Sequence, residues 1–135
     1  MVTFYLGCSF GMEDALEAAG VKLPKNVVSV SMFVTNIACH QSGPFSANMV
    51  VSLRSVPIDL LEEVYRATYT LDCCHGAPVH IGDPTLIGIS DIYDVDFGVP
   101  TVIKEDEIPV FFACGVTGNK ALQSAREFCD FICNL

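Results

Sequence analysis

The chain has 135 residues, of which 51% are hydrophobic and only 17% are charged. Sixteen acidic residues outnumber seven basic ones, giving a formal net charge of -9. This charge argues against nucleic acid or an anionic membrane surface as a partner, because both are bound through clustered positive charge. No apolar run approaches the roughly 20 residues of a membrane span, and the length predicts one domain over residues 1–135 with its own core.

Hydrophobic periodicity and turn residues predict strands that alternate with helices. In chain order we expect a strand at 2–6, a helix at 12–19, a strand within 27–34, a loop at 35–44, a strand at 48–56, a helix from Pro57, a loop at 72–84, a short helix at 85–89, strands at 99–103 and 108–114, and a helix at 120–132. Ser9 is expected to cap the first helix and Gly20 to end it, with Pro57 in the first turn of the second. The alternation predicts an α/β fold, a single domain with a mixed β-sheet flanked by helices.

Seven cysteines are present, an odd number, and none forms a CxxC pair. Several lie in apolar runs, where a thiol behaves as a small hydrophobic group. We therefore expect reduced thiols and an intracellular location. A structural zinc site is the alternative, although no paired-ligand spacing recurs.

The most informative segment is the loop from His75 to Pro84, which holds two histidines, a carboxylate, two prolines and two glycines. Imidazole titrates near physiological pH and suits proton transfer. We therefore take His75, His80 and Asp83 as candidate catalytic residues for general acid–base chemistry. Two alternatives stay open: Asp83 caps the helix that Pro84 begins, or the three side chains bind a metal. Their spacing matches no standard motif, so we expect neither a metal nor another cofactor.

Four further residues are candidates for binding a substrate. Arg54 ends an apolar strand, and its guanidinium suits a substrate carboxylate, although an ion pair with a helix acid such as Glu62 would also explain it. Thr35 and Asn36 follow a β-rich run, and Asn36 could stabilise an oxyanion or simply form an Asx-turn. Ser9 follows Gly7 and Cys8, where backbone amides could line an anion pocket at a helix start.

An ordered set of motifs resembles the D-glutamate cyclase and "putative hydro-lyase" family. The motifs run from about Phe4 to Thr117 and read FYLGCSF, EDAL, TNIAC, MVVSLRSVP, HGAPVHIGDP, LIGISDI, DFG and EIPVFFACGVT. Against the family pattern, Ala38 stands where proline is common and Phe112 where tryptophan is common. The segments that usually precede LGCSF and follow ACGVT also differ, so the resemblance implies a version of the family domain that is truncated at both ends.

The resemblance implies an α/β fold and lyase activity. The implied reaction is cyclisation of D-glutamate to 5-oxo-D-proline with loss of water, by acid–base catalysis through His75 or His80 with Asp83. Arg54, Asn36, Thr35 and Ser9 would bind the substrate, a small amino acid or carboxylate. The alternative is a non-catalytic small-molecule-binding or structural fragment of the same fold. We expect the mitochondrial matrix for an animal protein and the cytoplasm for a bacterial one, and an apolar surface would favour a homo-oligomer.

Overall fold

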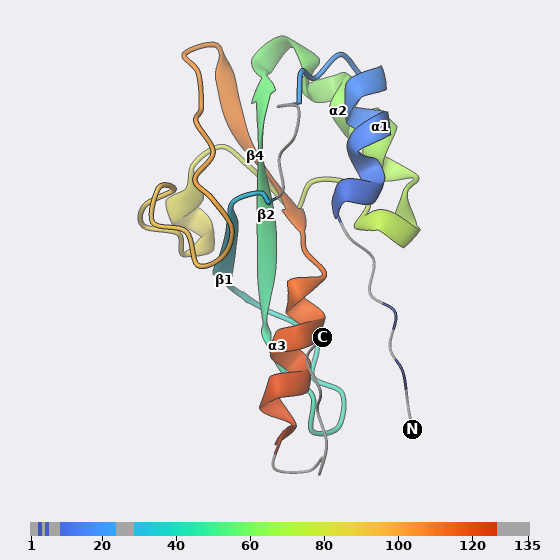
Figure 1. Ribbon diagram of the computed structural model, residues 1–135, viewed down its shortest axis with the longest axis vertical. Helices are drawn as coiled ribbons and strands as arrows, with labels where there is room; N and C mark the ends of the chain where they lie inside the picture. The colour runs from blue at the N-terminus through green and yellow to red at the C-terminus, as the bar shows by residue number, and fades with distance from the viewer. Residues whose placement is uncertain (1–2, 4, 6–8, 24–28, 127–135) are drawn as a thin grey trace.

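The computed structural model describes residues 3, 5, 9–23 and 29–126 (Figure 1). Among these residues a four-stranded sheet has the order β1-β2-β4-β3, built from β1 (Met32–Ala38), β2 (Asn48–Pro57), β3 (His80–Ile81) and β4 (Glu107–Ala113). Three α-helices accompany it, α1 (Glu13–Ala18), α2 (Leu61–Tyr69) and α3 (Val116–Ser124). Four 3-10 turns complete these elements, η1 (Ser9–Met12), η2 (Ile58–Leu60), η3 (Asp72–Cys74) and η4 (Pro84–Ile87).

The predicted α/β fold is confirmed, but the expected mixed sheet is wrong. All three strand pairings among the described residues are antiparallel: β1 with β2, β2 with β4, and β4 with β3. The β2–α2–β3 connection leaves β2 and β3 pointing the same way, as a crossover helix should. The last strand, β4, then inserts between them in the opposite direction. The order of elements along the chain does not reveal that insertion.

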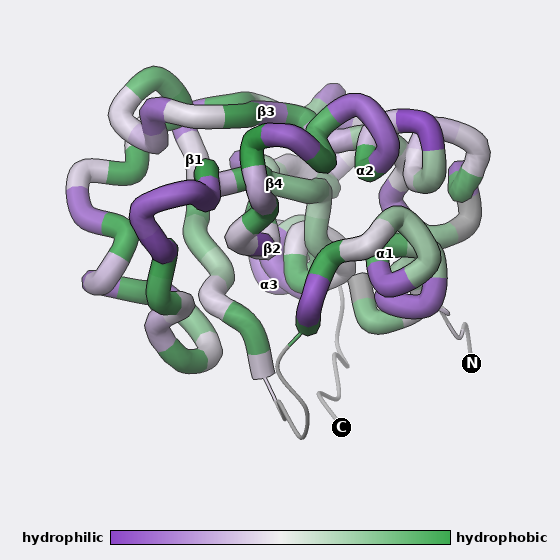
Figure 2. Tube along the Cα trace, turned by 90° about the horizontal axis from the view of Figure 1, so that it is seen from above, coloured by the Kyte–Doolittle hydropathy of each residue, from purple (hydrophilic) through white to green (hydrophobic). Residues whose placement is uncertain are grey.

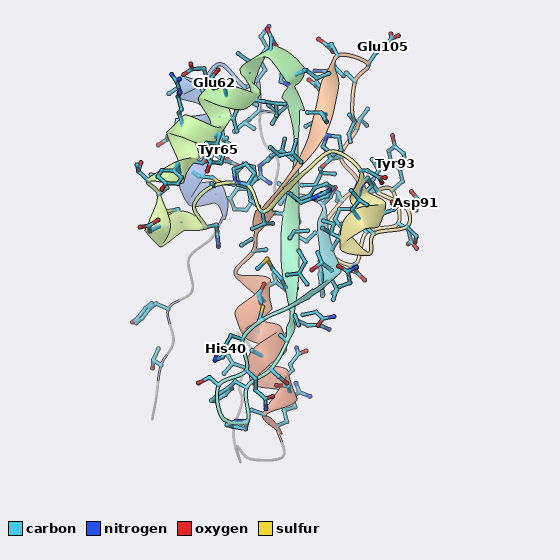
Figure 3. All side chains as sticks on the ribbon, turned by 180° about the vertical axis from the view of Figure 1, so that it is seen from behind. His40, Glu62, Tyr65, Asp91, Tyr93 and Glu105 are labelled. Carbon is cyan, nitrogen blue, oxygen red and sulfur yellow. The ribbon has the colours of Figure 1, made fainter. Side chains whose placement is uncertain are left out.

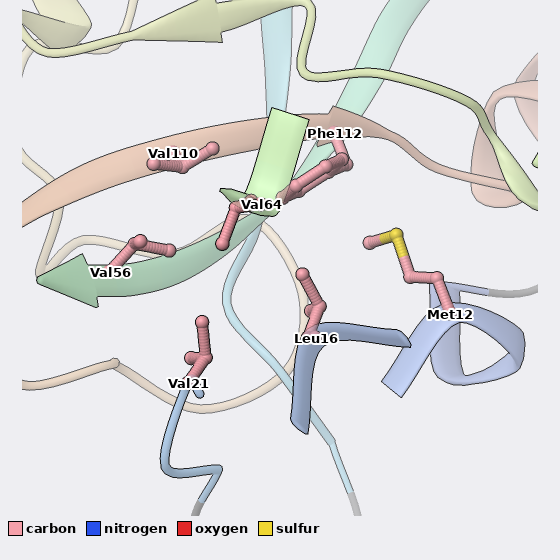
Figure 4. Packing of buried hydrophobic residues seen from close by; sticks show 7 residues of the cluster. All are labelled: Met12, Leu16, Val21, Val56, Val64, Val110 and Phe112. Atoms are coloured by element: carbon pink, nitrogen blue, oxygen red, sulfur yellow. The ribbon is translucent and has the colours of Figure 1, made fainter. Parts of the chain in front are cut away.

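The sheet buries both of its faces. On one face, side chains from β2 and β4 pack against α1 and α2 (Figure 4); the cluster comprises Met12, Leu16, Val21, Val56, Val64, Val110 and Phe112. The other face is covered by η4 and the residues after it, and this cluster comprises Phe33, Val51, Leu53, Ile87, Ile89 and Phe111. Because side chains alternate along a strand, neighbouring residues of β2 and β4 serve opposite clusters. Figure 2 shows apolar stretches in the central strands between the two layers.

Of the predicted helix boundaries, the end of α1 is confirmed and two predicted starts are wrong. Gly20 has φ +92° and ends α1 as predicted, with its amide bonded to the Glu17 carbonyl and the Val21 amide bonded to the Leu16 carbonyl. The predicted Ser9 cap is wrong, because Met12 precedes α1 and Ser9 begins η1 three residues earlier. Pro57 ends β2 and is followed by η2, so it does not lie in the first turn of α2.

The first strand differs from prediction in its position. β1 extends through residues 35–38, which were expected in a loop, because they continue the pairing with β2 after an irregularity between Val34 and Ala38. The predicted strand at 99–103 is absent from the described structure. That segment instead runs beside the outer edge of β1, where Met32 and Phe97 form an isolated bridge and the Ser31 hydroxyl donates to the Val99 carbonyl. Pro100 lacks the backbone donor that a strand needs.

The remaining expectations concern the ends of the chain. The last helix, α3, begins at Val116, four residues before the predicted start, and the part of the prediction at 127–132 lies outside the described residues. The predicted strand at 2–6 also falls mostly outside them. Within the described part of the chain, no helix is both long and apolar enough to cross a membrane.

Candidate functional site

The sheet separates the predicted site residues into two groups. Arg54 lies on the face covered by α1 and α2, whereas His80 lies on the face covered by η4. Figure 3 shows the two layers from behind: Glu62 and Tyr65 on α2 lie on one side, and Asp91 and Tyr93 on the other. A small substrate that contacts Arg54 therefore cannot contact His80 without passing through the core.

Arg54 is a buried cation in the middle of a strand. Arg54 is 4% exposed, and its Nη2 lies 3.3 Å from Oε1 of Glu13 at the start of α1. Its Nη1 also donates to the Leu53 carbonyl at 3.2 Å. The predicted ion pair with a helix acid therefore exists, but its partner is Glu13. Glu62 pairs instead with Arg66 on the surface of α2.

A buried hydroxyl lies on the same face as Arg54. Ser52 precedes Arg54 by two residues on β2, so the two side chains point to the same side of the sheet. Ser52 is fully buried opposite Phe112 of β4, and its hydroxyl has no hydrogen-bond partner among the described residues. A buried hydroxyl without a partner costs free energy, so its presence calls for a physical explanation.

His75 belongs to this helix-covered side through its neighbours. It follows η3, which packs against η1, and a Cβ placed on Gly11 of η1 would lie 2.9 Å from the Cys74 sulfur. His75 has φ +82° and is the one non-glycine residue with a positive φ in the described part of the chain. This left-handed conformation is strained for a residue with a Cβ, and such strain concentrates at functional sites. His75 is partly buried.

His80 is held by contacts on the opposite face. Its ring lies 5.8 Å from the Phe111 ring, and its Nε2 lies 2.7 Å from the backbone carbonyl of Asp83. A carbonyl oxygen only accepts, so Nε2 carries the hydrogen and Nδ1 of neutral His80 offers the lone pair. The structure thus joins His80 to the Asp83 backbone and leaves the carboxylate to other contacts.

The Asp83 carboxylate caps η4. Its Oδ1 accepts hydrogen bonds from the Thr85 amide at 2.9 Å and the Thr85 hydroxyl at 2.7 Å, which confirms the predicted capping role. The Thr85 hydroxyl and then its amide lower the pKa of Asp83, and the charge of His80 lowers it further. The carboxyl group is therefore ionised at neutral pH and has no proton to donate.

Thr35 and Asn36 lie on β1, at the far edge of the sheet from β3. The Thr35 hydroxyl donates to the Met49 carbonyl at 2.8 Å and accepts from the Ile37 amide at 3.2 Å, so it holds the irregular part of β1 in place. Asn36 is exposed and touches Gly88, whose added Cβ would lie 3.1 Å from that of Asn36. Three strand spacings, about 14 Å, separate the two edges. Asn36 and His80 thus lie on opposite edge strands of the sheet.

One candidate, Ser9, and two further polar residues remain to be placed. Ser9 begins η1 beside η3, and its side chain lies outside those the structure describes. The first turn of α3 is tied to β2, because the Thr117 hydroxyl accepts from the Val50 amide at 2.9 Å. His40 is exposed in the loop after β1 (Figure 3). Among the described residues, no group of three or more His, Cys, Asp or Glu side chains is placed to hold a metal ion.

Comparison with known proteins gives the chain its family. The family model described as D-glutamate cyclase matches residues 2–133. The chain belongs to the D-glutamate cyclase family. A protein of Syntrophobacter fumaroxidans named "putative hydro-lyase" is 47% identical over 133 residues, which are 96% of this chain and 51% of that protein. A similarly named protein of Bradyrhizobium diazoefficiens is 48% identical over 129 residues, 93% of this chain and 47% of that protein.

The chain thus spans about half the length of the curated relatives that it matches. The other half of each of these relatives has no counterpart in the match. The residues described above are therefore those that this half of the family sequence contributes. Any activity of the complete relatives remains a proposal for this chain.

Two polar residues that accompany Arg54 on the helix-covered face, Glu13 and Ser52, were not predicted from the sequence. Ser52 carried a signal: it is a polar residue inside the apolar run 49–56, in register with Arg54 on one strand face. Glu13 carried none, because an acidic residue in the first turn of a helix is explained by the helix dipole alone. Only the packing of α1 on the sheet brings it to Arg54.

Proposed function

We propose that this chain anchors the substrate carboxylate and carries proton transfer in a hydro-lyase reaction that converts D-glutamate to 5-oxo-D-proline. One observation carries the proposal: a buried arginine, Arg54, meets a carboxylate at the margin of the helix-covered face. A guanidinium in a site of low polarity binds carboxylates through charge and paired hydrogen bonds. Membership of the D-glutamate cyclase family supports glutamate as the substrate.

The reaction balances without a co-reactant. The α-amine nitrogen attacks the γ-carboxyl carbon, a C–N bond forms, and a C–O bond breaks. The two protons lost by the ammonium group both end on the departing oxygen, which leaves as water. The α-carboxylate is unchanged throughout, so an Arg54 anchor would hold substrate and product alike while fixing the orientation of the reacting groups.

A base for this step must lie on the same side of the sheet as Arg54. His75 meets that condition through the packing of η3 on η1, and its strained backbone conformation supports a functional role. We therefore assign proton transfer to His75. His80 and Asp83 lie across the sheet, and we assign them to fixing the β3–η4 connection.

Chiral chromatography of D-glutamate and 5-oxo-D-proline tests this proposal. Wild type should form product, while Arg54→Met and His75→Gln should each lose at least 100-fold in kcat/KM. For His75 this is a typical loss for a general acid–base group, and for Arg54 it reflects the loss of a charged anchor for the carboxylate. His80→Gln, the matched control, should retain activity within about threefold. Equal loss in His75→Gln and His80→Gln would contradict the assignment of the base.

A second candidate is a ligand-binding module without catalysis. It is supported by the separation of His80 from Arg54 and by the engagement of the Asp83 carboxylate in a cap. Calorimetry separates the two: this alternative predicts binding of D-glutamate that requires Arg54, with no product formed.

A further inference from the structure

The buried hydroxyl of Ser52 makes no hydrogen bond with the described residues. It is fully buried and lies on the strand face that carries Arg54. Residues two apart on a strand are about 7 Å apart at the Cα atoms, a span that a long arginine side chain and one small anion can bridge. The Ser52 hydroxyl thus lies on the same strand face as Arg54 and has an unused capacity to donate a hydrogen bond.

The anion now at Arg54 is a side chain of the protein itself. Oε1 of Glu13 lies 3.3 Å from Nη2, longer than the roughly 2.7–2.9 Å of a strong charge-assisted hydrogen bond. The Glu13 side chain is 34% exposed, whereas that of Arg54 is 5% exposed. Glu13 therefore occupies the solvent-facing end of the pair, and an entering anion would reach the guanidinium by taking its place.

We propose that Glu13 is a resident carboxylate that the ligand replaces, and that Ser52 and Arg54 together bind the incoming carboxylate. On displacement, Glu13 turns to solvent, where its exposed position lets it be hydrated. The ligand carboxylate accepts hydrogen bonds from Arg54 and from the Ser52 hydroxyl. In this exchange the negative charge that Glu13 places beside Arg54 is replaced by that of the ligand.

The ligand is a small molecule with an α-carboxylate. That this molecule is D-glutamate rests on the proposed function. The two acceptor oxygens of a carboxylate suit one hydroxyl donor and one guanidinium. Chloride carries the same charge, but as a single atom it lacks the two separate acceptor oxygens of a carboxylate. The site should therefore distinguish a carboxylate from a simple anion.

Formate binding at constant ionic strength, measured by calorimetry and thermal shift, tests the exchange. Glu13→Gln removes the competing charge and should lower the formate Kd at least tenfold relative to wild type. Adding Ser52→Ala to Glu13→Gln should raise the Kd about tenfold, the loss expected for one hydrogen bond to a charged group. Chloride should bind Glu13→Gln at least tenfold more weakly than formate.

Matched controls lie on the same elements. Glu17→Gln changes an exposed acid of α1, and Ser55→Ala changes the serine of β2 that faces away and donates to Glu107. Both should leave formate binding unchanged. If circular dichroism shows that Glu13→Gln does not fold, Glu13→Asp replaces it: its shorter side chain weakens the contact with Arg54, so the formate Kd should still fall relative to wild type.

Two results would overturn the inference: an unchanged formate Kd in Glu13→Gln, or an unchanged Kd on adding Ser52→Ala. Failure of the proposed function looks different. Formate and D-glutamate would then bind as described, while the wild-type chain would form no 5-oxo-D-proline. If the wild-type chain forms 5-oxo-D-proline but neither Glu13→Gln nor Ser52→Ala changes the formate Kd, the carboxylate exchange is wrong and the proposed function is unaffected.

Discussion

Removing the two ends of the Arg54–Glu13 ion pair should have unequal effects on stability. Glu13→Gln leaves a guanidinium that is 5% exposed without the Glu13 charge, whereas Arg54→Met leaves a carboxylate that is 34% exposed and can be hydrated. Replacing a buried charge by an apolar side chain of similar size is often neutral, while removing the opposite charge that faces a buried ion is costly. We expect Glu13→Gln to be the more destabilising change.

The geometry sets the size of the difference. Two unit charges 3.3 Å apart attract by about 5 kcal/mol at an effective dielectric constant of about 20, and by about 1.3 kcal/mol at the value of water. Since Glu13 is one-third exposed, its interaction lies toward the lower figure. We expect Glu13→Gln to lose about 2 kcal/mol of unfolding free energy and Arg54→Met to change it by less than about 1 kcal/mol.

Urea unfolding followed by circular dichroism measures both values, since the chain has no tryptophan to report by fluorescence. The double variant Glu13→Gln/Arg54→Met completes the cycle and should be no less stable than Arg54→Met alone. An equal loss of stability in Arg54→Met and Glu13→Gln would refute this expectation. That outcome would mean that the packing of the arginine stem matters more than its charge.

Three further predictions follow from single residues. Ser52→Ala should raise the unfolding free energy by about 1 kcal/mol, because it removes a buried hydroxyl that lacks a partner; a loss in urea unfolding would contradict this. Burial raises the pKa of Glu107, but hydrogen bonds from Ser55 and Lys104 and the Lys104 charge outweigh it and leave the pKa lowered. Its contribution to stability is therefore complete above its unfolded-state pKa and lost as pH falls through the folded-state pKa. Glu107→Gln should flatten the acid side of a stability–pH profile. Gly98→Ala should cost more than about 2 kcal/mol in thermal unfolding, because φ is +84° and the added Cβ would clash with the Val30 carbonyl; Gly43→Ala, with φ +56° and open space, should cost less.

Sequence patterns predicted the elements best where one signal dominated. The run 48–56 is apolar and β-branched, and it became β2 almost to the residue. The segment 99–103 is also β-rich, yet Pro100 and the route along the β1 edge leave it irregular. Strand pairing decides such cases, and pairing partners lie far away in the sequence.

The candidate site also divides into features that the sequence indicates and features that depend on strand pairing. The sequence singled out Arg54, His75 and His80 by residue type. It could not show that Arg54 and His80 point to opposite faces of one sheet, because this depends on the alternation of side chains in two strands and on the register of β4 between them. It also missed Glu13, whose role exists only because α1 packs over β2.

By itself the sequence determined the α/β class, the family motifs, the capping of η4 by Asp83 and the end of α1 at Gly20, since these depend on neighbours within a few residues. Only the tertiary structure decided the antiparallel order β1-β2-β4-β3 and the partition of the candidate residues by the sheet. Local chemistry is readable along the chain because it involves contacts of short range. The meeting of Glu13 with Arg54 spans 41 residues, and only folding brings these charges together.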